Sequence, residues 1–152
     1  MPRICYEKEH PIPKSMLRAV ILDFDAYPTF IPQVRSCSVQ DAGKAAWEVA
    51  IEMFVIRPLF YRIRLEEEET KGIIRWDLLE GVFTTNRGFW HIQETDLGCL
   101  VHYEVEIQLG TFLPSIIAKT VQEQAIPNLI EAFVKETQCR VDILQKSDPN
   151  DN

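Results

Sequence analysis

Between residues 35 and 109 the chain alternates apolar and polar positions. In the segment WEVAIEM, the apolar residues Trp47, Val49, Ile51 and Met53 fall on one side and two glutamates fall on the other. The segments YRIRLE, IIRWDLL and LVHYEVEI repeat this pattern. A period of two with one apolar side is typical of antiparallel strands that have one buried face and one wet face. The segment therefore predicts a meander of six strands, following a short first strand around residues 4–7.

Glycines mark the breaks between these strands. Four of them fall where a turn is needed, namely Gly43, Gly72, Gly81 and Gly98. Gly88 instead lies inside a strand pattern, which predicts a bulge or a bend there.

Two other segments have a helical period. In PKSMLRAVILDF the apolar residues recur at helical spacing, with Pro13 suited to the first turn and Pro28 unable to continue the helix. A second short helical turn before Val34 is also compatible with the pattern. From about Phe112 to Val141 apolar residues recur every four positions, and 30 residues of helix would extend about 45 Å. Pro127 lies inside this segment and is expected to kink it.

Together these elements predict an α+β fold. A curved antiparallel sheet of about six or seven strands would wrap around one long C-terminal helix, with one or two short helices after the first strand. We expect residues 1–145 to form a single domain and residues 146–152 to form a flexible tail.

Charge and composition exclude several classes of partner. The chain of 152 residues has a net charge of −7 and a pI near 5.0, without a dense basic patch. Nucleic acids and anionic membrane surfaces are therefore not expected partners. No apolar stretch reaches the length of a membrane span, and the charged start lacks the apolar core of a signal peptide. We expect a cytoplasmic protein with reduced thiols.

Candidate chemistry is sparse. The four cysteines are scattered without a CxxC motif, so no metal site is predicted. No nucleophile elbow, HExxH motif or glycine-rich phosphate loop occurs, so the sequence indicates no catalytic residue and no cofactor. His91 and His102 fall on the wet side of their strands. The acidic run from Glu66 to Glu69 precedes turn residues and is expected to be a solvated hairpin end.

Two motifs resemble a known superfamily. The segment ILDFDAYPTFIPQV is similar to the D-x-x-x-Y-P-x-F-x-P signature of the START and polyketide cyclase (helix-grip, SRPBCC) superfamily, in its branch of coenzyme Q-binding proteins and ribosome-association toxins. The matching positions are Asp23, Tyr27, Pro28, Phe30 and Pro32. The segment LLEGVFTTNRGFWHI resembles the branch's hairpin motif at Leu78, Gly81, Phe83, Gly88 and Trp90. The resemblance covers roughly residues 3–144 and implies the same helix-grip fold.

The chain departs from the branch at two positions. Gln33 stands where members often have tryptophan, and Val82 stands where the hairpin commonly has proline. Both positions shape the corner and the hairpin, so the ligand of the named relatives is not carried over.

The resemblance and the inward-facing aromatic residues predict a ligand cavity between the sheet and the C-terminal helix. Large rings that carry one polar atom suit such a pocket. The candidate ligand-binding residues are Phe30, Met53, Trp76, Leu78, Phe83, Trp90, Ile92, Tyr103, Val105, Ile117, Val121 and Leu129. Tyr27 is expected to pack the first helix onto the sheet, whereas Phe30 either packs there or lines an entrance. Asp23 is expected to stabilise the corner.

Three functions remain open at this stage. The leading one is a binding protein for a hydrophobic small molecule such as a lipid, quinone or polycyclic aromatic compound. A cyclase or dehydratase would require an inward-facing His, Asp, Glu or Arg, and the alternation places none there. A ribosome-associated protein would require an exposed basic face, which an acidic chain does not suggest. The pattern gives no indication of the oligomeric state.

Overall fold

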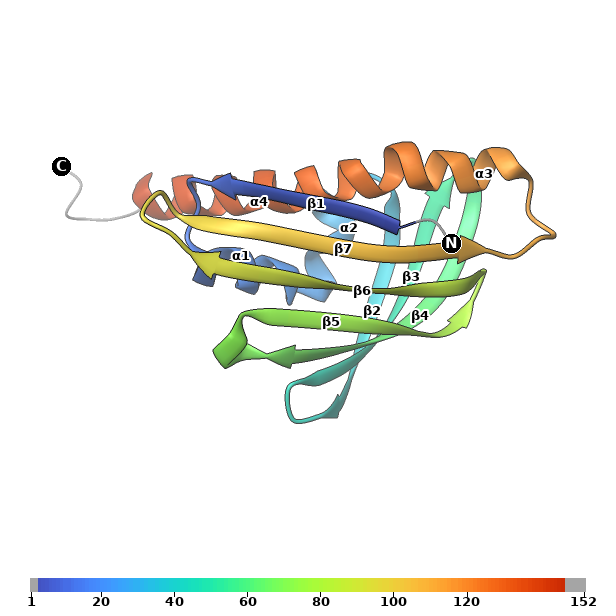
Figure 1. Cartoon of the computed structure of the whole chain (residues 1–152), viewed down its shortest axis with the longest axis horizontal. Coiled ribbons are helices and arrows are strands. Elements are labelled where there is room, and N and C mark those ends of the chain that lie inside the picture. The colour runs from blue at the N-terminus through green and yellow to red at the C-terminus, as the bar shows by residue number, and fades with distance from the viewer. Residues whose placement is uncertain (1–2, 147–152) are drawn as a thin grey trace.

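A curved sheet of seven antiparallel strands wraps around a long C-terminal helix (Figure 1). The computed structural model describes residues 3–146. The strands are β1 (Arg3–His10), β2 (Val34–Gly43), β3 (Ala46–Val55), β4 (Arg57–Glu68), β5 (Ile73–Gly81), β6 (Phe83–Glu94) and β7 (Cys99–Leu109), in the spatial order β1-β7-β6-β5-β4-β3-β2. The predicted meander from β2 to β7 is confirmed, and β1 returns to pair with β7.

The helices lie in the two predicted segments, between the first and second strands and after the last strand. Between β1 and β2 lie α1 (Lys14–Ile21), the 3₁₀ turn η1 (Phe24–Ala26) and α2 (Tyr27–Phe30). A short 3₁₀ turn, η2 (Glu69–Lys71), joins β4 to β5. After β7 come α3 (Ser115–Thr120), the π-helical turn η3 (Val121–Ala125) and α4 (Ile126–Lys146), so the helix begins and ends later than predicted. Lys146, assigned to the tail from the sequence, belongs to α4; the rest of that predicted tail lies outside the described residues.

The irregularity predicted at Pro127 takes the form of a π turn. Proline lacks a backbone N–H and its ring crowds the carbonyl four residues earlier, here that of Glu123. The N–H of Ile126 bonds to the carbonyl of Val121, five residues back, instead of four. The helical turn before the proline is therefore widened.

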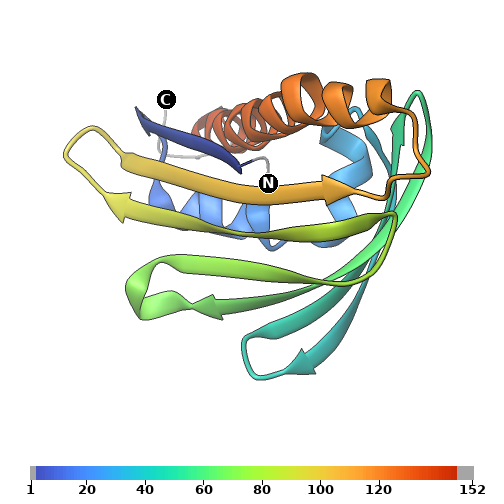
Figure 2. The same cartoon turned by 45° about the vertical axis from the view of Figure 1, so that its right-hand side comes forward.

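The concave face of the sheet is turned toward the terminal helix (Figure 2), and the buried apolar residues of both form the core. Along β7 the odd-numbered residues from Cys99 to Leu109 are buried, whereas His102 and Glu104 are half-buried on the outer face. This confirms the alternation predicted from the sequence. On α4 the buried residues are Ile126, Ile130, Phe133 and Thr137, which share the side facing the sheet.

The segment AYPTFIPQVRS forms a packed corner. The Tyr27 hydroxyl donates a hydrogen bond to the carbonyl of Ile21, and the Tyr27 ring lies 5.2 Å from the ring of Phe133. Beside it, Asp23 forms an ion pair with Arg140 of α4 at 2.9 Å. The corner thus attaches the first helical segment to the last one, as expected for Tyr27 and Asp23.

The expectation that the acidic run from Glu66 to Glu69 is a solvated hairpin end is wrong at Glu67. Its carboxylate accepts two hydrogen bonds from the guanidinium of Arg18, at 2.5 and 2.8 Å. The Glu67 side chain is only 4% exposed, because α1 covers it. A bidentate pair of this kind orients α1 on β4.

Of the bulge or bend predicted at Gly88, the bulge is wrong. The pairing between β6 and β7 runs without a shift through Gly88, which lies opposite Val105, and the irregularity falls between Phe83 and Thr85. A Cβ atom at Gly88 would overlap the carbonyl oxygen of Glu104 and lie 2.8 Å from Cζ2 of Trp76. Glycine is needed at this position because the Trp76 ring packs directly beneath the strand.

Replacement of Gly88 by alanine therefore tests the close approach. We expect Gly88→Ala to lower the free energy of unfolding by about 1–3 kcal/mol, because the added methyl group overpacks the site. Urea denaturation followed by circular dichroism measures the change. The exposed Gln93→Ala in the same strand is the control, expected to stay within about 0.5 kcal/mol of the parent protein. Equal stability of the two variants would contradict this account of Gly88.

Candidate ligand-binding site

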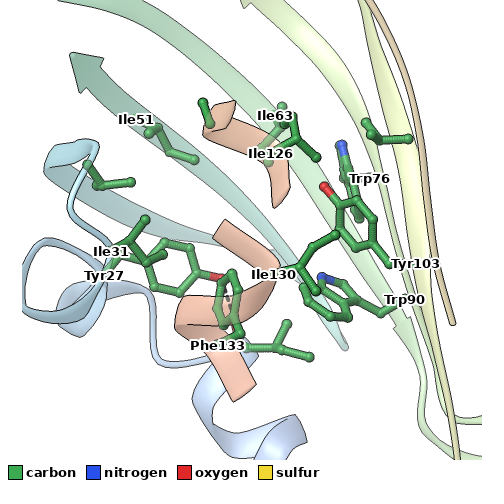
Figure 3. Packing of buried hydrophobic residues seen from close by; sticks show 14 of the residues in the cluster. Tyr27, Ile31, Ile51, Ile63, Trp76, Trp90, Tyr103, Ile126, Ile130 and Phe133 are labelled. Carbon is green, nitrogen blue, oxygen red and sulfur yellow. Dashed lines mark hydrogen bonds between the residues drawn. The ribbon is translucent and has the colours of Figure 1, made fainter. Parts of the chain in front are cut away.

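Aromatic side chains from five elements meet on the inner face of the sheet (Figure 3). The Phe133 ring of α4 lies 5.3 Å from Trp90 and 5.5 Å from Phe30, in both cases edge to face. Trp90 in turn contacts Tyr103 with their ring centroids 4.7 Å apart. Offset and edge-to-face pairs of this kind stabilise beyond simple burial. Helix α4 is thereby held on β6 and β7.

A second group of rings continues from Tyr103 toward the start of α4. Trp76 lies 5.5 Å from Tyr103, and its indole N–H donates a 3.0 Å hydrogen bond to Oδ1 of Asn86. Further along, Tyr61 contacts Phe83 at 5.0 Å and directs its hydroxyl at the sulfur of Met53. These residues form an aromatic wall on β3–β7.

Exposure varies along the inner face. Near α1 the core is sealed: Leu17, Val20 and Ile21 are 0% exposed. Inner residues on β3–β6 and the first residue of α4 each keep 6–9% of their surface accessible; these are Ile51, Tyr61, Ile63, Trp76, Phe83, Asn86 and Ile126. In Figure 3, Ile51 and Ile63 lie on the sheet opposite Ile126. Apart from Tyr27 in the corner and Leu109 at the end of β7, the core residues that keep this residual exposure gather between the sheet and the start of α4. We refer to this part of the core as the loosely packed region.

Within the described part of the chain, the charged pair on the inner side of the sheet is that of Glu67 with Arg18 beside α1. Glu67 has the inward parity of Leu65, so the prediction that no ionisable side chain faces inward is wrong at this position. Elsewhere the inner face holds no buried charged residue. Only two buried residues there are polar, Asn86 and Thr137. The Thr137 hydroxyl donates to the carbonyl of Phe133 in its own helix, so it is satisfied locally. An unpaired charge would be strongly destabilised in such surroundings. The site suits an apolar or neutral guest.

Burial also determines how the ionisable groups behave. It raises the pKa values of Tyr61 and Tyr103 far above the ordinary value, so both hydroxyls remain protonated at neutral pH and act as donors. Burial raises the pKa of the Cys37 thiol to about 12 and that of the Cys99 thiol to about 11, which leaves neither as a thiolate nucleophile. No group of three or more metal-ligating side chains occurs within residues 3–146.

The candidate residues named from the sequence fall into three groups. Trp76, Trp90 and Tyr103 are in mutual contact, and Met53 and Phe83 join them through Tyr61. Val105, Ile117 and Val121 are buried in the same core. The others lie at its margins: Leu78 and Leu129 are half-buried, Phe30 packs on Phe133, and Ile92 borders a surface hollow beside α1. Their contact with a ligand stays a prediction.

Sequence reasoning missed Asn86 as a member of the site. Asn86 has the same parity as Trp90 in β6, so the alternation places it inward. The signal that identifies it is a polar, non-ionisable residue at an inward position of the strand. Tyr61 was recognised as inward but was not included among the binding residues.

Hollows of about 330–430 Å³ open at the surface of the described chain, on the outer face of the sheet, beside α1 and along the outer side of α4. One of them, of about 380 Å³, lies on the outer face where the pairing of β5 with β6 ends at Trp76 and Gly88. The inner aromatic rings are in contact, so a sizeable guest requires side chains or the terminal helix to move.

Solved structures of similar shape define the class of fold. An aromatase/cyclase, ZhuI from Streptomyces sp. R1128, superposes with a TM-score of 0.78 at 14% identity, covering 92% of this chain and 95% of that one. The protein TTHA0849 from Thermus thermophilus gives 0.80 at 16% identity, covering 91% and 99%. A START superfamily protein from Mycobacterium smegmatis gives 0.74 at 14% identity, covering 90% and 97%. The architecture is thus the START-like helix-grip fold.

The sequence places the protein more narrowly. Residues 12–134 match the family described as polyketide cyclase / dehydrase and lipid transport, and the chain belongs to that family. No curated protein matches the chain significantly. Within residues 3–146 there is no helix both long enough and apolar enough to cross a membrane.

The role of Phe133 can be tested by truncation. We expect Phe133→Ala to lower the free energy of unfolding by about 3–5 kcal/mol, because it leaves a cavity among Tyr27, Phe30 and Trp90. Ile143→Ala, on an exposed position of the same helix, should change it by less than about 0.5 kcal/mol. Urea denaturation distinguishes the two; a Phe133→Ala variant as stable as Ile143→Ala would contradict the packing described.

The tyrosine hydroxyls offer a pH test. Because burial raises the pKa values of Tyr27, Tyr61 and Tyr103, the folded chain retains protons that the unfolded chain releases above the ordinary value of 10.0. Stability should therefore fall as the pH rises past this value. In the native protein, phenolate absorbance from these residues should appear at a higher pH than in the unfolded chain, together with unfolding. Early ionisation of all tyrosines in the native state would contradict the burial of these hydroxyls.

Proposed function

We propose that this protein binds a hydrophobic small molecule between the aromatic wall of β3–β7 and the start of α4. The observation that carries the proposal is the inner face itself, which is aromatic, holds no buried charged residue opposite the start of α4 in the described chain, and keeps residual exposure opposite Ile126. Membership of a family whose description includes lipid transport supports this function.

Burial of the guest supplies the binding free energy. Each methylene group removed from water contributes about 0.8 kcal/mol, so a chain or ring system of moderate size binds without any charged contact. The resemblance of the two sequence motifs to the coenzyme Q-binding branch supports a quinone or lipid as the guest. The departures at Gln33 and Val82 are the reason to test both classes.

Native mass spectrometry of the freshly purified protein and a thermal-shift screen test the proposal. We expect a co-purified guest, or a stabilisation of about 2.7 kcal/mol by a quinone, fatty acyl compound or polycyclic aromatic at about 100 times its Kd. Ile126→Trp should fill the loosely packed region and weaken this response, whereas Ile143→Trp on the exposed side of α4 should not. A purified protein without a bound guest, together with a screen in which no compound raises the melting temperature, would contradict the proposed function.

A cyclase or dehydratase activity is the second candidate, and the name of the family favours it. The shape of the inner face could fold a reactive chain. However, the part of the inner face opposite the start of α4 offers amide, hydroxyl and indole groups, and the inward carboxylate of Glu67 lies beside α1 in a bidentate pair with Arg18. Binding is therefore the better-supported function.

A further inference from the structure

The polar atoms of the inner face are few, and one of them has a defined orientation. The indole N–H of Trp76 is a donor only, so the atom of Asn86 that receives it at 3.0 Å must be the carbonyl oxygen Oδ1. The amide nitrogen of Asn86 therefore points away from Trp76 with two N–H groups. It makes no hydrogen bond to any residue between 3 and 146.

Tyr103 supplies a second donor in the same region. The residue is 3% exposed, and its hydroxyl likewise makes no hydrogen bond within the described chain. In Figure 3 the Tyr103 hydroxyl and the Trp76 indole nitrogen point to the same side, toward Ile63 and Ile126. These two isoleucines belong to the loosely packed region.

Neither donor is completely enclosed. Gln33 Oε1 is the only side-chain oxygen or nitrogen in the described chain that is both sealed from solvent and unpaired. The unpaired hydroxyl of Tyr103 and amide of Asn86 therefore still border accessible space. Two buried donors without acceptors that are not fully sealed from solvent are a half-complete hydrogen-bonding site.

We propose that Tyr103 and Asn86 together bind one uncharged oxygen acceptor of the hydrophobic guest, such as a ketone or ester carbonyl. This assignment rests on the proposed binding function and adds to it the chemistry of the guest. The Tyr103 hydroxyl and the Asn86 amide both donate, and a carbonyl oxygen has the two lone pairs to accept from them. A guest with a carboxylate or phosphate in this position is excluded, because the described interior holds no cation to compensate it.

Three rigid probes of similar shape separate these possibilities: fluorene, which has no acceptor; fluorenone, which has one neutral carbonyl; and fluorenone carboxylate, which is charged. Their Kd values can be measured by quenching of tryptophan fluorescence, since Trp76 and Trp90 line the site. We expect fluorenone to bind about tenfold more tightly than fluorene, corresponding to about 1.4 kcal/mol, and the carboxylate to bind least.

Two variants assign the effect to the named residues. Tyr103→Phe and Asn86→Leu should each reduce the affinity for fluorenone several-fold while leaving the affinity for fluorene nearly unchanged. Tyr6→Phe is the matched control, because its hydroxyl is bonded to His10 on the edge strand β1. Circular dichroism verifies that each variant is folded, and either of the two variants suffices for the test.

The outcomes distinguish the inference from the function on which it rests. Selective loss of fluorenone binding supports the donor pair. Equal affinity for fluorene and fluorenone, or equal losses for both probes in the variants, would overturn the donor pair and leave hydrophobic binding intact. If no probe binds and no compound in the thermal-shift screen stabilises the protein, both the donor pair and the proposed binding function are contradicted.

Discussion

The contact between α4 and the concave face of the sheet determines the rest of the structure. Phe133 lies at its centre, touching Trp90 on the sheet and Tyr27 in the corner. The ion pair between Asp23 and Arg140 reinforces the same attachment nearer the end of the helix. Because these contacts gather on one half of the helix, the other half meets the sheet with less dense packing. The candidate site lies there.

Because one face of each strand and helix is buried, apolar residues that recur every two or every four positions show which side chains point inward. The architecture was therefore largely predictable from the sequence. Alternation identified the inward residues of β3, β4 and β7 correctly, and the later helix followed from its spacing. The expectations of a bulge at Gly88 and of a solvated Glu67 failed for a common reason. Gly88 makes room for a ring from the neighbouring strand, and Glu67 pairs with an arginine 49 residues earlier. Local pattern contains no information about such long-range partners.

The candidate site was predictable only in part. Parity placed Trp76, Trp90 and Tyr103 on one side, and their contacts confirm that they lie together. How tightly they pack depends on the curvature of the sheet and on the exact path of the helix, neither of which a periodicity reveals. Asn86 could have been found by parity alone, since the polarity of an inward residue is visible in the sequence.

The π turn η3 acts as a register adjustment between two helical faces. The buried residues Ile117, Val121 and Ala125 recur every four positions up to the end of η3, and the buried residues of α4 restart directly at Ile126. A straight α-helix advances about 100° per residue, so with this spacing it could not keep both sets on one side. The π turn accommodates one residue more than a regular helix would hold. Loss of a single residue within η3 would therefore give a regular helix in which both sets still share one face, whereas a further insertion would rotate α3 by roughly 100° and turn Ile117 toward water.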